Sequence, residues 1–293
     1  MKERSNLTYH IIAFLTVAIW GSTFISTKVL IINGLSPAQI FTLRFILAYV
    51  LMLIFSHRKL FADNIHDELL MLALGVTGGS AYFLTENEAL RFSTATNVAL
   101  IVCSCPLFAT LLFHFFMKGS HLGMHHISGS IIACLGMAAV VLNGHFVLHL
   151  SPIGDTLAFA ACLCWAVYSL LMKYINEHYS SDFITRKVFF YGLLTIIPYY
   201  IIKPGFPDID TLLKPEVLYN LLFLGCIASM LCFLTWTWVM YHLGAIRATN
   251  YVYLNPVTTI IFAAWILGEQ ITPYFIVGTF LILSGLYISN KRT

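Results

Sequence analysis

The chain has 293 residues, of which 59% are hydrophobic and 10% are charged, with a formal net charge of +3 and a mean hydropathy of +0.84. Soluble domains carry roughly a quarter charged residues, so this composition excludes an ordinary soluble protein. Apolar runs recur along the whole chain, and each is long enough to cross a hydrocarbon core of about 30 Å as a helix. We therefore expect an all-α integral membrane protein embedded in a lipid bilayer.

Ten apolar runs follow one another, separated by breaks such as "NGLSP", "KPGFPD" and "GEQITP". The predicted transmembrane helices cover residues 8–31, 37–56, 69–90, 95–117, 125–143, 153–174, 183–202, 217–241, 246–267 and 273–290. The first run lacks a small-x-small cleavage site, so we interpret it as a retained helix and not as a signal peptide.

Most lysines and arginines fall in alternate connections between the runs. If the N-terminus is placed inside, the outer connections hold only Arg91, Lys203 and Lys214. Basic residues favour the cytoplasmic side of a membrane, so both termini are predicted to be cytoplasmic. Because the basic residues lie between the spans, the net charge gives no indication of nucleic-acid binding.

The two halves of the sequence resemble each other. "ATNVALIVCSCP" (95–106) returns as "ATNYVYLNP" (248–256). Each of these segments is followed by a glycine ladder with the spacing G-x9-G-x6-G: Gly119, Gly129 and Gly136 in the first half, and Gly268, Gly278 and Gly285 in the second. A tryptophan and a lysine eight residues apart lie near the start of each half: Trp20 and Lys28, and Trp165 and Lys173. Small residues along one helix face allow close helix packing, so the ladders predict contacts within or between the halves.

The repeat divides the chain into residues 8–143 and residues 152–290. Each half has five predicted spans, an odd number, so the second half enters the membrane upside down. Inverted repeats are typical of secondary transporters, whose substrate path runs between the halves near the midplane. Pro106 and Pro256 fall in corresponding spans, where a missing backbone donor permits a kink, and we interpret them as candidate hinges. The alternative is that they are simply tolerated.

Four segments carry a resemblance to a known family: "WGSTFISTK" (20–28), "LRFILAYVL" (43–51), "EALRFSTATNVALI" (88–101) and "NPVTTIIFAAWILGEQ" (255–270). Through them the sequence resembles the drug/metabolite transporter superfamily, specifically its EamA-type ten-helix exporters. The resemblance implies two inverted five-helix repeats around a central cavity, and export of amino acids or related small metabolites across the cell inner membrane. One departure is Lys118-Gly119, which stands where the Gly268-Glu269 pair would recur.

Four charged residues lie within or at the edge of apolar runs: Lys28, Arg44, Glu86 and Glu88. The predicted topology places all four in the outer half of the membrane. A lone charge at mid-bilayer costs roughly 2.5–3.5 kcal/mol, so such groups pair or face water. We expect one of the glutamates to neutralise one of the basic residues, although Lys28 could instead snorkel to the surface. Glu86 shares a helix face with Tyr82, where a carboxylate could couple proton entry to export.

Aromatic and amide side chains within the spans are the candidate substrate-binding residues: Trp20, Tyr82, Asn97, Trp165, Tyr168, Trp236, Trp238, Asn250, Tyr253 and Asn255. A buried amide needs a hydrogen-bond partner, which is either another helix or a substrate. The tryptophans at positions 20 and 165 lie deep within spans, which favours packing or cavity lining over anchoring at the membrane interface.

Two other functions remain as alternatives. An exchanger of phosphorylated metabolites or nucleotide sugars needs basic residues in the cavity, for which only Lys28 and Arg44 are available. A membrane-embedded enzyme needs a cluster of His, Asp or Ser at one depth, which the sequence does not show. We therefore expect no enzymatic activity, no cofactor and no metal. Substrate identity, proton coupling and a homodimeric state stay open.

Overall fold

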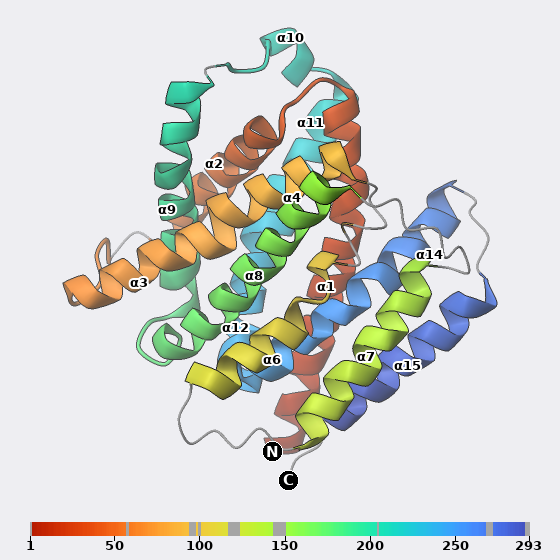
Figure 1. The fold of residues 1–293 in the computed structure, drawn as a ribbon. Helices are drawn as coiled ribbons and strands as arrows, with labels where there is room; N and C mark the ends of the chain where they lie inside the picture. Colours follow the sequence, from red (N-terminus) through yellow and green to blue (C-terminus); the bar gives the residue numbers. More distant parts are fainter. Residues whose placement is uncertain are drawn as a thin grey trace.

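The computed structural model describes residues 2–56, 59–93, 98, 101–116, 124–142, 151–203, 205–267 and 272–290. This part of the chain is a bundle of helices without strands (Figure 1). Within it, five helical segments are long and apolar enough to cross a membrane: Leu7–Ile32, Pro37–Ile54, Ile65–Phe92, Pro152–Ile175 and Pro215–Leu243.

The helices of the first half follow the predicted spans within a few residues. They are α1 (Lys2–Ile32), α2 (Pro37–Phe55), α3 (Ile65–Gly75) continuing through η1 (Val76–Ser80) into α4 (Ala81–Phe92), α6 (Cys105–Phe116) and α7 (Met124–Leu142). The beginning of the predicted span 95–117 lies partly outside the described residues.

The second half of the chain is also helical. Its helices are α8 (Pro152–Ile175), α9 (Ser181–Ile202), α10 (Ile209–Leu212), α11 (Pro215–Leu222) continuing through η2 (Phe223–Leu231) into α12 (Cys232–Leu243), α13 (Ala245–Thr249), η3 (Asn250–Leu254), α14 (Asn255–Leu267) and α15 (Pro273–Asn290). The short helix α10 was not predicted. Figure 1 shows that α1 begins and α15 ends at the same end of the bundle, opposite α10.

Two helices begin with the same local signal, Ser followed by Pro. In α2, Ser36 accepts a hydrogen bond from the Gln39 amide, and the Gln39 side chain accepts one from the Ser36 amide in return. In α8, the Ser151 hydroxyl accepts from the Gly154 amide, 3.3 Å away. These caps satisfy amides at the helix start, and proline at the first position needs no donor there. They fix the start of the two helices that supply Arg44 and Trp165.

The glycine ladders pack against each other in the contact between α7 and α15. A Cβ atom on Gly129 would lie 2.6 Å from the Gly285 carbonyl oxygen, and one on Gly136 would lie 2.6 Å from that of Gly278. The first glycine of one helix therefore faces the second described glycine of the other, as in an antiparallel pair. Only residues without a side chain permit this approach. The predicted ladder positions 119 and 268 lie outside the described residues.

The third predicted span of each half contains a π-helical segment: η1 lies in the span 69–90 and η2 in the span 217–241. Within η1, Gly79 leaves helical geometry altogether, with φ −127° and ψ −106°. Gly75 approaches α9 and Gly225 approaches Leu47 of α2, so each break adjoins a close contact with the other half. π-helical turns are rare and occur frequently at functional sites. The residues that follow these breaks line the cavity described below.

The two predicted hinge prolines lie at helix starts and not at kinks in continuous helices. Pro106 is the second residue of α6, and Pro256 is the second residue of α14. In that first turn a backbone N–H would have no intrahelical partner, so proline costs nothing. Tight turns precede both starts: the Ser104 amide bonds to the Ile101 carbonyl, and η3 precedes α14. Each span is therefore interrupted before its proline.

Candidate functional site

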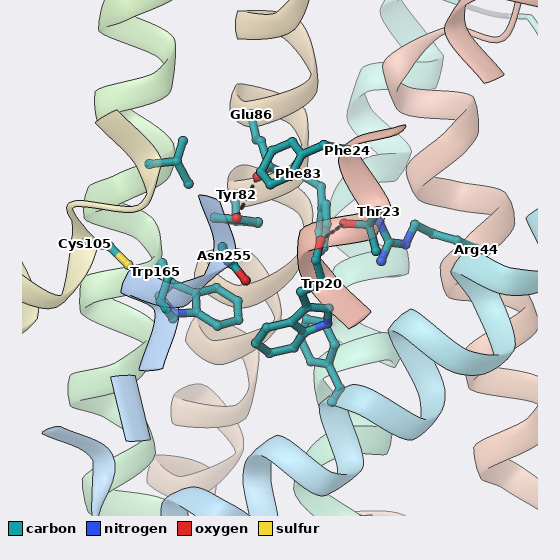
Figure 2. A pocket seen from close by; sticks show the side chains of 13 residues that line it. Trp20, Thr23, Phe24, Arg44, Tyr82, Phe83, Glu86, Cys105, Trp165 and Asn255 are labelled. Atoms are coloured by element: carbon teal, nitrogen blue, oxygen red, sulfur yellow. Dashed lines mark hydrogen bonds between the residues drawn. The ribbon is translucent and has the colours of Figure 1, made fainter. Parts of the chain in front are cut away.

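A cavity lies between helices of the two halves and contains about 510 Å³ of unfilled space, part of it open to the outside. The lining residues come from α1, α2, α4, α6, α8, α12, η3 and α14 and from Val102: Trp20, Thr23, Phe24, Arg44, Tyr82, Phe83, Glu86, Val102, Cys105, Trp165, Phe233, Val252 and Asn255 (Figure 2). Ligand sites are concave and mostly apolar, with a few polar groups that set orientation. This cavity has that composition.

Aromatic rings form much of its wall. The Trp20 and Trp165 rings meet edge to face with their centroids 5.5 Å apart, and the Trp20 and Phe233 centroids are 5.8 Å apart. The Trp20 indole nitrogen donates a hydrogen bond to the carbonyl oxygen of Ala228, 3.0 Å away in η2. Edge-to-face packing is a preferred arrangement of aromatic rings, so these contacts hold the wall in one geometry.

Arg44 and Glu86 enter this apolar cavity from different helices (Figure 2). The Arg44 Nε atom donates to the Ser229 hydroxyl, 2.8 Å away, and its guanidinium carbon lies 4.5 Å from the centre of the Phe83 ring. Glu86 Oε1 accepts from the Tyr82 hydroxyl at 2.8 Å. The two opposite charges line one cavity, yet they form no ion pair among those found in the described residues. Each charge is held in place by a different neutral partner.

Two further polar atoms of the lining residues are buried without a hydrogen-bond partner in the described part of the chain. They are the indole nitrogen of Trp165, a donor, and the amide oxygen of Asn255, an acceptor. Buried polar groups are nearly always paired, so two unpaired ones at one cavity need an explanation such as a bound solute. The cavity thus offers hydrogen-bond donors and acceptors as well as both signs of charge.

The structure brings together six of the residues singled out in the sequence. The cavity is lined by Trp20, Arg44, Tyr82, Glu86, Trp165 and Asn255. Five other candidates do not line it: Tyr168, Trp236, Trp238, Asn250 and Tyr253. Asn97 lies outside the described residues.

The five residues outside the cavity have other surroundings. Tyr168, Trp236 and Tyr253 are fully buried in the core, with the ring of Tyr168 against Gly78. The Asn250 side chain donates to the Ser289 hydroxyl, which joins η3 to α15. Trp238 lies against Tyr9 near the surface. Of the five, Tyr168 packs against Trp165 and Trp236 packs against Trp20, with ring centroids 5.1 Å and 5.0 Å apart.

The charged residues Lys28 and Glu88 do not line the cavity either. Lys28 is exposed, as expected of a snorkelling side chain. Glu88 pairs with Arg91 one turn along the helix, at 2.9 Å. Of the two glutamates, only Glu86 is therefore available to Arg44.

Several lining residues were not among the predicted ones, notably Thr23, Phe24, Phe83 and Phe233. Phe83 and Phe233 follow the π-helical breaks of the two halves, and their ring centroids are 6.4 Å apart. Phenylalanine is too common in membrane helices for these two positions to stand out in the sequence.

A second polar cluster joins α3 to α9 and lies toward the end of the bundle where the basic connections are. Glu68 accepts hydrogen bonds from the Lys187 ammonium and the Tyr191 hydroxyl, and this trio is called here the α3–α9 cluster. Beside it, Arg186 donates to the backbone carbonyls of Ser56 and Lys59. These contacts tie the first half of the chain to the second half.

The connection before α9 extends this network. The Tyr179 hydroxyl donates to Asp67 at 2.8 Å and accepts from the Asp63 amide at 2.9 Å. Burial raises the pKa of the Tyr179 phenol to about 12, so the group stays a neutral donor at physiological pH. Among the described residues no group of three or more His, Cys, Asp or Glu is arranged to hold a metal.

The sequence matches the EamA-like transporter family twice, over residues 7–142 and over residues 152–291. The chain therefore belongs to the EamA-like transporter family, and it is a membrane protein of the transporter class.

Curated relatives match over nearly the full length. A "Probable amino-acid metabolite efflux pump" of Escherichia coli strain K12 is 26% identical over 95% of this chain and 93% of its own. A "Probable terminal-alkyne amino-acid exporter" of Streptantibioticus cattleyicolor is 26% identical over 95% of this chain and 92% of its own. A solved crystal structure with 16% identity covers 97% of both chains at a TM-score of 0.76, which shows a shared fold.

Proposed function

We propose that the protein is a secondary exporter of small metabolites, amino acids or related compounds, and that the substrate passes through the cavity by alternating access. The observation that carries this proposal is a cavity between the two halves that presents both an arginine and a glutamate to an aromatic lumen. Charged residues inside a membrane protein mark substrate or ion pathways. The names of the two exporter relatives agree with this substrate class.

Two inverted five-helix repeats are the architecture proposed for this transport. The crosswise pairing of Gly129 with Gly285 and of Gly136 with Gly278 supports it, because exchanging the two repeats turns one pair into the other. The contact between Trp20 and Trp165, at matching places in the two halves, supports it in the same way. In such folds one half rocks against the other around a fixed site.

In our proposal, the α3–α9 cluster and the neighbouring Arg186 contacts close the transport path on one side of the membrane in the state that the structure shows. They hold the two halves together away from the cavity, and a buried ion pair that breaks and re-forms is a natural two-state element. We place this side in the cytoplasm, with both chain termini, because the basic connections lie there.

We further propose that Glu86 couples transport to protons by taking one up from outside and releasing it inside. An exchange of phosphorylated compounds is less well supported, because Lys28 does not line the cavity and leaves Arg44 as the basic lining residue among those described. The two negative charges of a phosphate group would exceed the single positive charge of one guanidinium group.

Transport into inside-out vesicles tests the proposal. We expect amino-acid uptake that rises with an imposed pH gradient, and loss of that response in Glu86→Gln. Glu88→Gln is the matched control, since Glu88 lies two residues further on and outside the cavity. Equal uptake with and without the gradient in all three proteins would contradict proton coupling, and no uptake of any metabolite would contradict export.

A further inference from the structure

We propose that the cavity binds a zwitterionic α-amino acid by its two charged ends, with the carboxylate on Arg44, the ammonium group on Glu86 and an apolar side chain against the tryptophans. This inference rests on the proposed function of the same cavity and names which solutes it selects. It distinguishes amino acids from the amines and the carboxylic acids that share their side chains.

Arg44 is prepared to receive an anionic group. Its Nε–H is used by Ser229, and its guanidinium lies on the face of Phe83. The terminal guanidinium nitrogens donate to no acceptor found among the described residues. Ser229 and Phe83 therefore fix the plane of the group and leave its outer edge for a ligand. A planar guanidinium with two parallel N–H bonds matches a carboxylate.

Glu86 is prepared to receive a cationic group. Tyr82 donates to Oε1 and orients the carboxylate, and Oε2 receives no hydrogen bond from the described residues. Asn255 adds an unpaired buried amide oxygen to the same cavity. An ammonium group has three donors and needs several acceptors at once, so these oxygens are suitable partners. A proton on Glu86 would remove its charge, which makes proton uptake and ammonium binding mutually exclusive.

Charge balance selects the zwitterion over either half of it. The arginine and the glutamate carry opposite charges within a cavity that is mostly apolar. A simple amine would compensate one charge and leave the guanidinium unpaired, and a simple acid would leave the carboxylate unpaired. Unpaired charges in a low-dielectric site are strongly unfavourable. A zwitterion compensates both and adds no net charge to the membrane interior.

The remaining wall selects the side chain. Trp20, Trp165 and Phe233 contact one another and leave an apolar surface on the cavity side. A polar side chain would lose its water there without gaining partners, whereas an aliphatic or aromatic one would bury apolar area. The selected class is therefore amino acids with apolar side chains.

Two series of ligands test the inference on the purified full-length protein, and the three ligands within each series have the same side chain. One series is L-leucine, 3-methylbutylamine and 4-methylpentanoate, and the other is L-phenylalanine, 2-phenylethylamine and 3-phenylpropanoate. Binding is measured through tryptophan fluorescence, to which Trp20 and Trp165 contribute from the cavity wall. We expect at least one amino acid to bind about tenfold or more tightly than its amine and its acid, the gain typical of a charge-assisted hydrogen bond.

Variants assign the two ends. Arg44→Gln is expected to lower amino-acid affinity about tenfold or more and to leave the amine unchanged, and Glu86→Gln is expected to lower amino-acid and amine affinity and to spare the acid. Arg44→Lys keeps the charge and serves if Arg44→Gln does not fold. Arg91→Gln and Glu88→Gln are the matched controls outside the cavity, expected to change none of the affinities.

Two outcomes overturn the inference. One is that neither amino acid binds more tightly than both of its fragments. The other is that each cavity variant weakens amino acid, amine and acid equally, which would make the charges structural. Vesicle transport of a defined mixture of amino acids, amines and acids distinguishes failure of this inference from failure of the proposed function. Transport without zwitterion preference contradicts only the inference, and transport of nothing contradicts the exporter itself.

Discussion

The indole nitrogen of Trp20 donates a hydrogen bond to the backbone carbonyl of Ala228, 3.0 Å away. Ala228 lies in η2, where the helical hydrogen-bond pattern is altered, so a side chain from the first half binds the interrupted backbone of the second half. This bond sets the position of the Trp20 ring in the cavity wall. It also provides a direct comparison with Trp165, whose indole nitrogen has no partner among the described residues.

Replacing these two tryptophans by phenylalanine should therefore have unequal effects. Trp20→Phe leaves the Ala228 carbonyl without its partner and should destabilise the protein by about 1–3 kcal/mol. Trp165→Phe removes no hydrogen bond to the described residues and should cost less. Thermal unfolding of the purified variants measures the difference. Equal losses of stability would contradict the assigned role of the Trp20–Ala228 bond.

A methyl group in the α7–α15 contact should loosen the bundle. Gly136→Ala places a Cβ atom 2.6 Å from the Gly278 carbonyl, a distance that only a backbone shift can relieve. Overpacking of this kind typically costs about 1–3 kcal/mol. Leu135→Ala, on the neighbouring exposed position, is the control and should leave the unfolding temperature nearly unchanged. An equally stable Gly136→Ala protein would show that this contact is not close-packed.

The α3–α9 cluster should show strong pairwise coupling. Lys187 is 3% exposed and Glu68 is 15% exposed, so removing one partner leaves the other charge poorly solvated. We expect Lys187→Met and Glu68→Gln each to cost about 1–3 kcal/mol, and the double variant to cost less than their sum. The exposed pair Lys59–Asp63 provides a matched cycle with no measurable coupling expected. Additive costs at the cluster would mean that the ion pair contributes nothing.

Hydrophobicity predicted the limits of most described helices within a few residues, because a helix that crosses a membrane must satisfy its backbone hydrogen bonds along a fixed apolar length. Trp20, Arg44 and Glu86 were singled out in the sequence because aromatic and charged groups deep in spans pack, pair or line a cavity, and all three line the cavity in the structure. The equivalence of Gly129 and Gly278 in the repeat predicted a packing face.

Other features depend on tertiary contacts that no local pattern records. The π-helical segments adjoin places where Gly75 and Gly225 approach the other half, and both segments fall inside continuous predicted helices, 69–90 and 217–241. Trp20 and Trp236 are both buried tryptophans of long helices, yet only Trp20 lines the cavity. Helical periodicity identifies a buried face, but it does not tell a packed core from a cavity wall.

Access of a water-soluble reagent to the cavity from each side of the membrane is the decisive test of alternating access. Thr23 lines the cavity, so Thr23→Cys in a functional chain whose seven native cysteines are replaced provides a single reporter thiol. We expect a membrane-impermeant thiol reagent to modify this cysteine from either side, bound amino acid to slow the reaction, and modification to stop transport. Reaction from one side only under every condition, or full transport after complete modification, would contradict alternating access through this cavity.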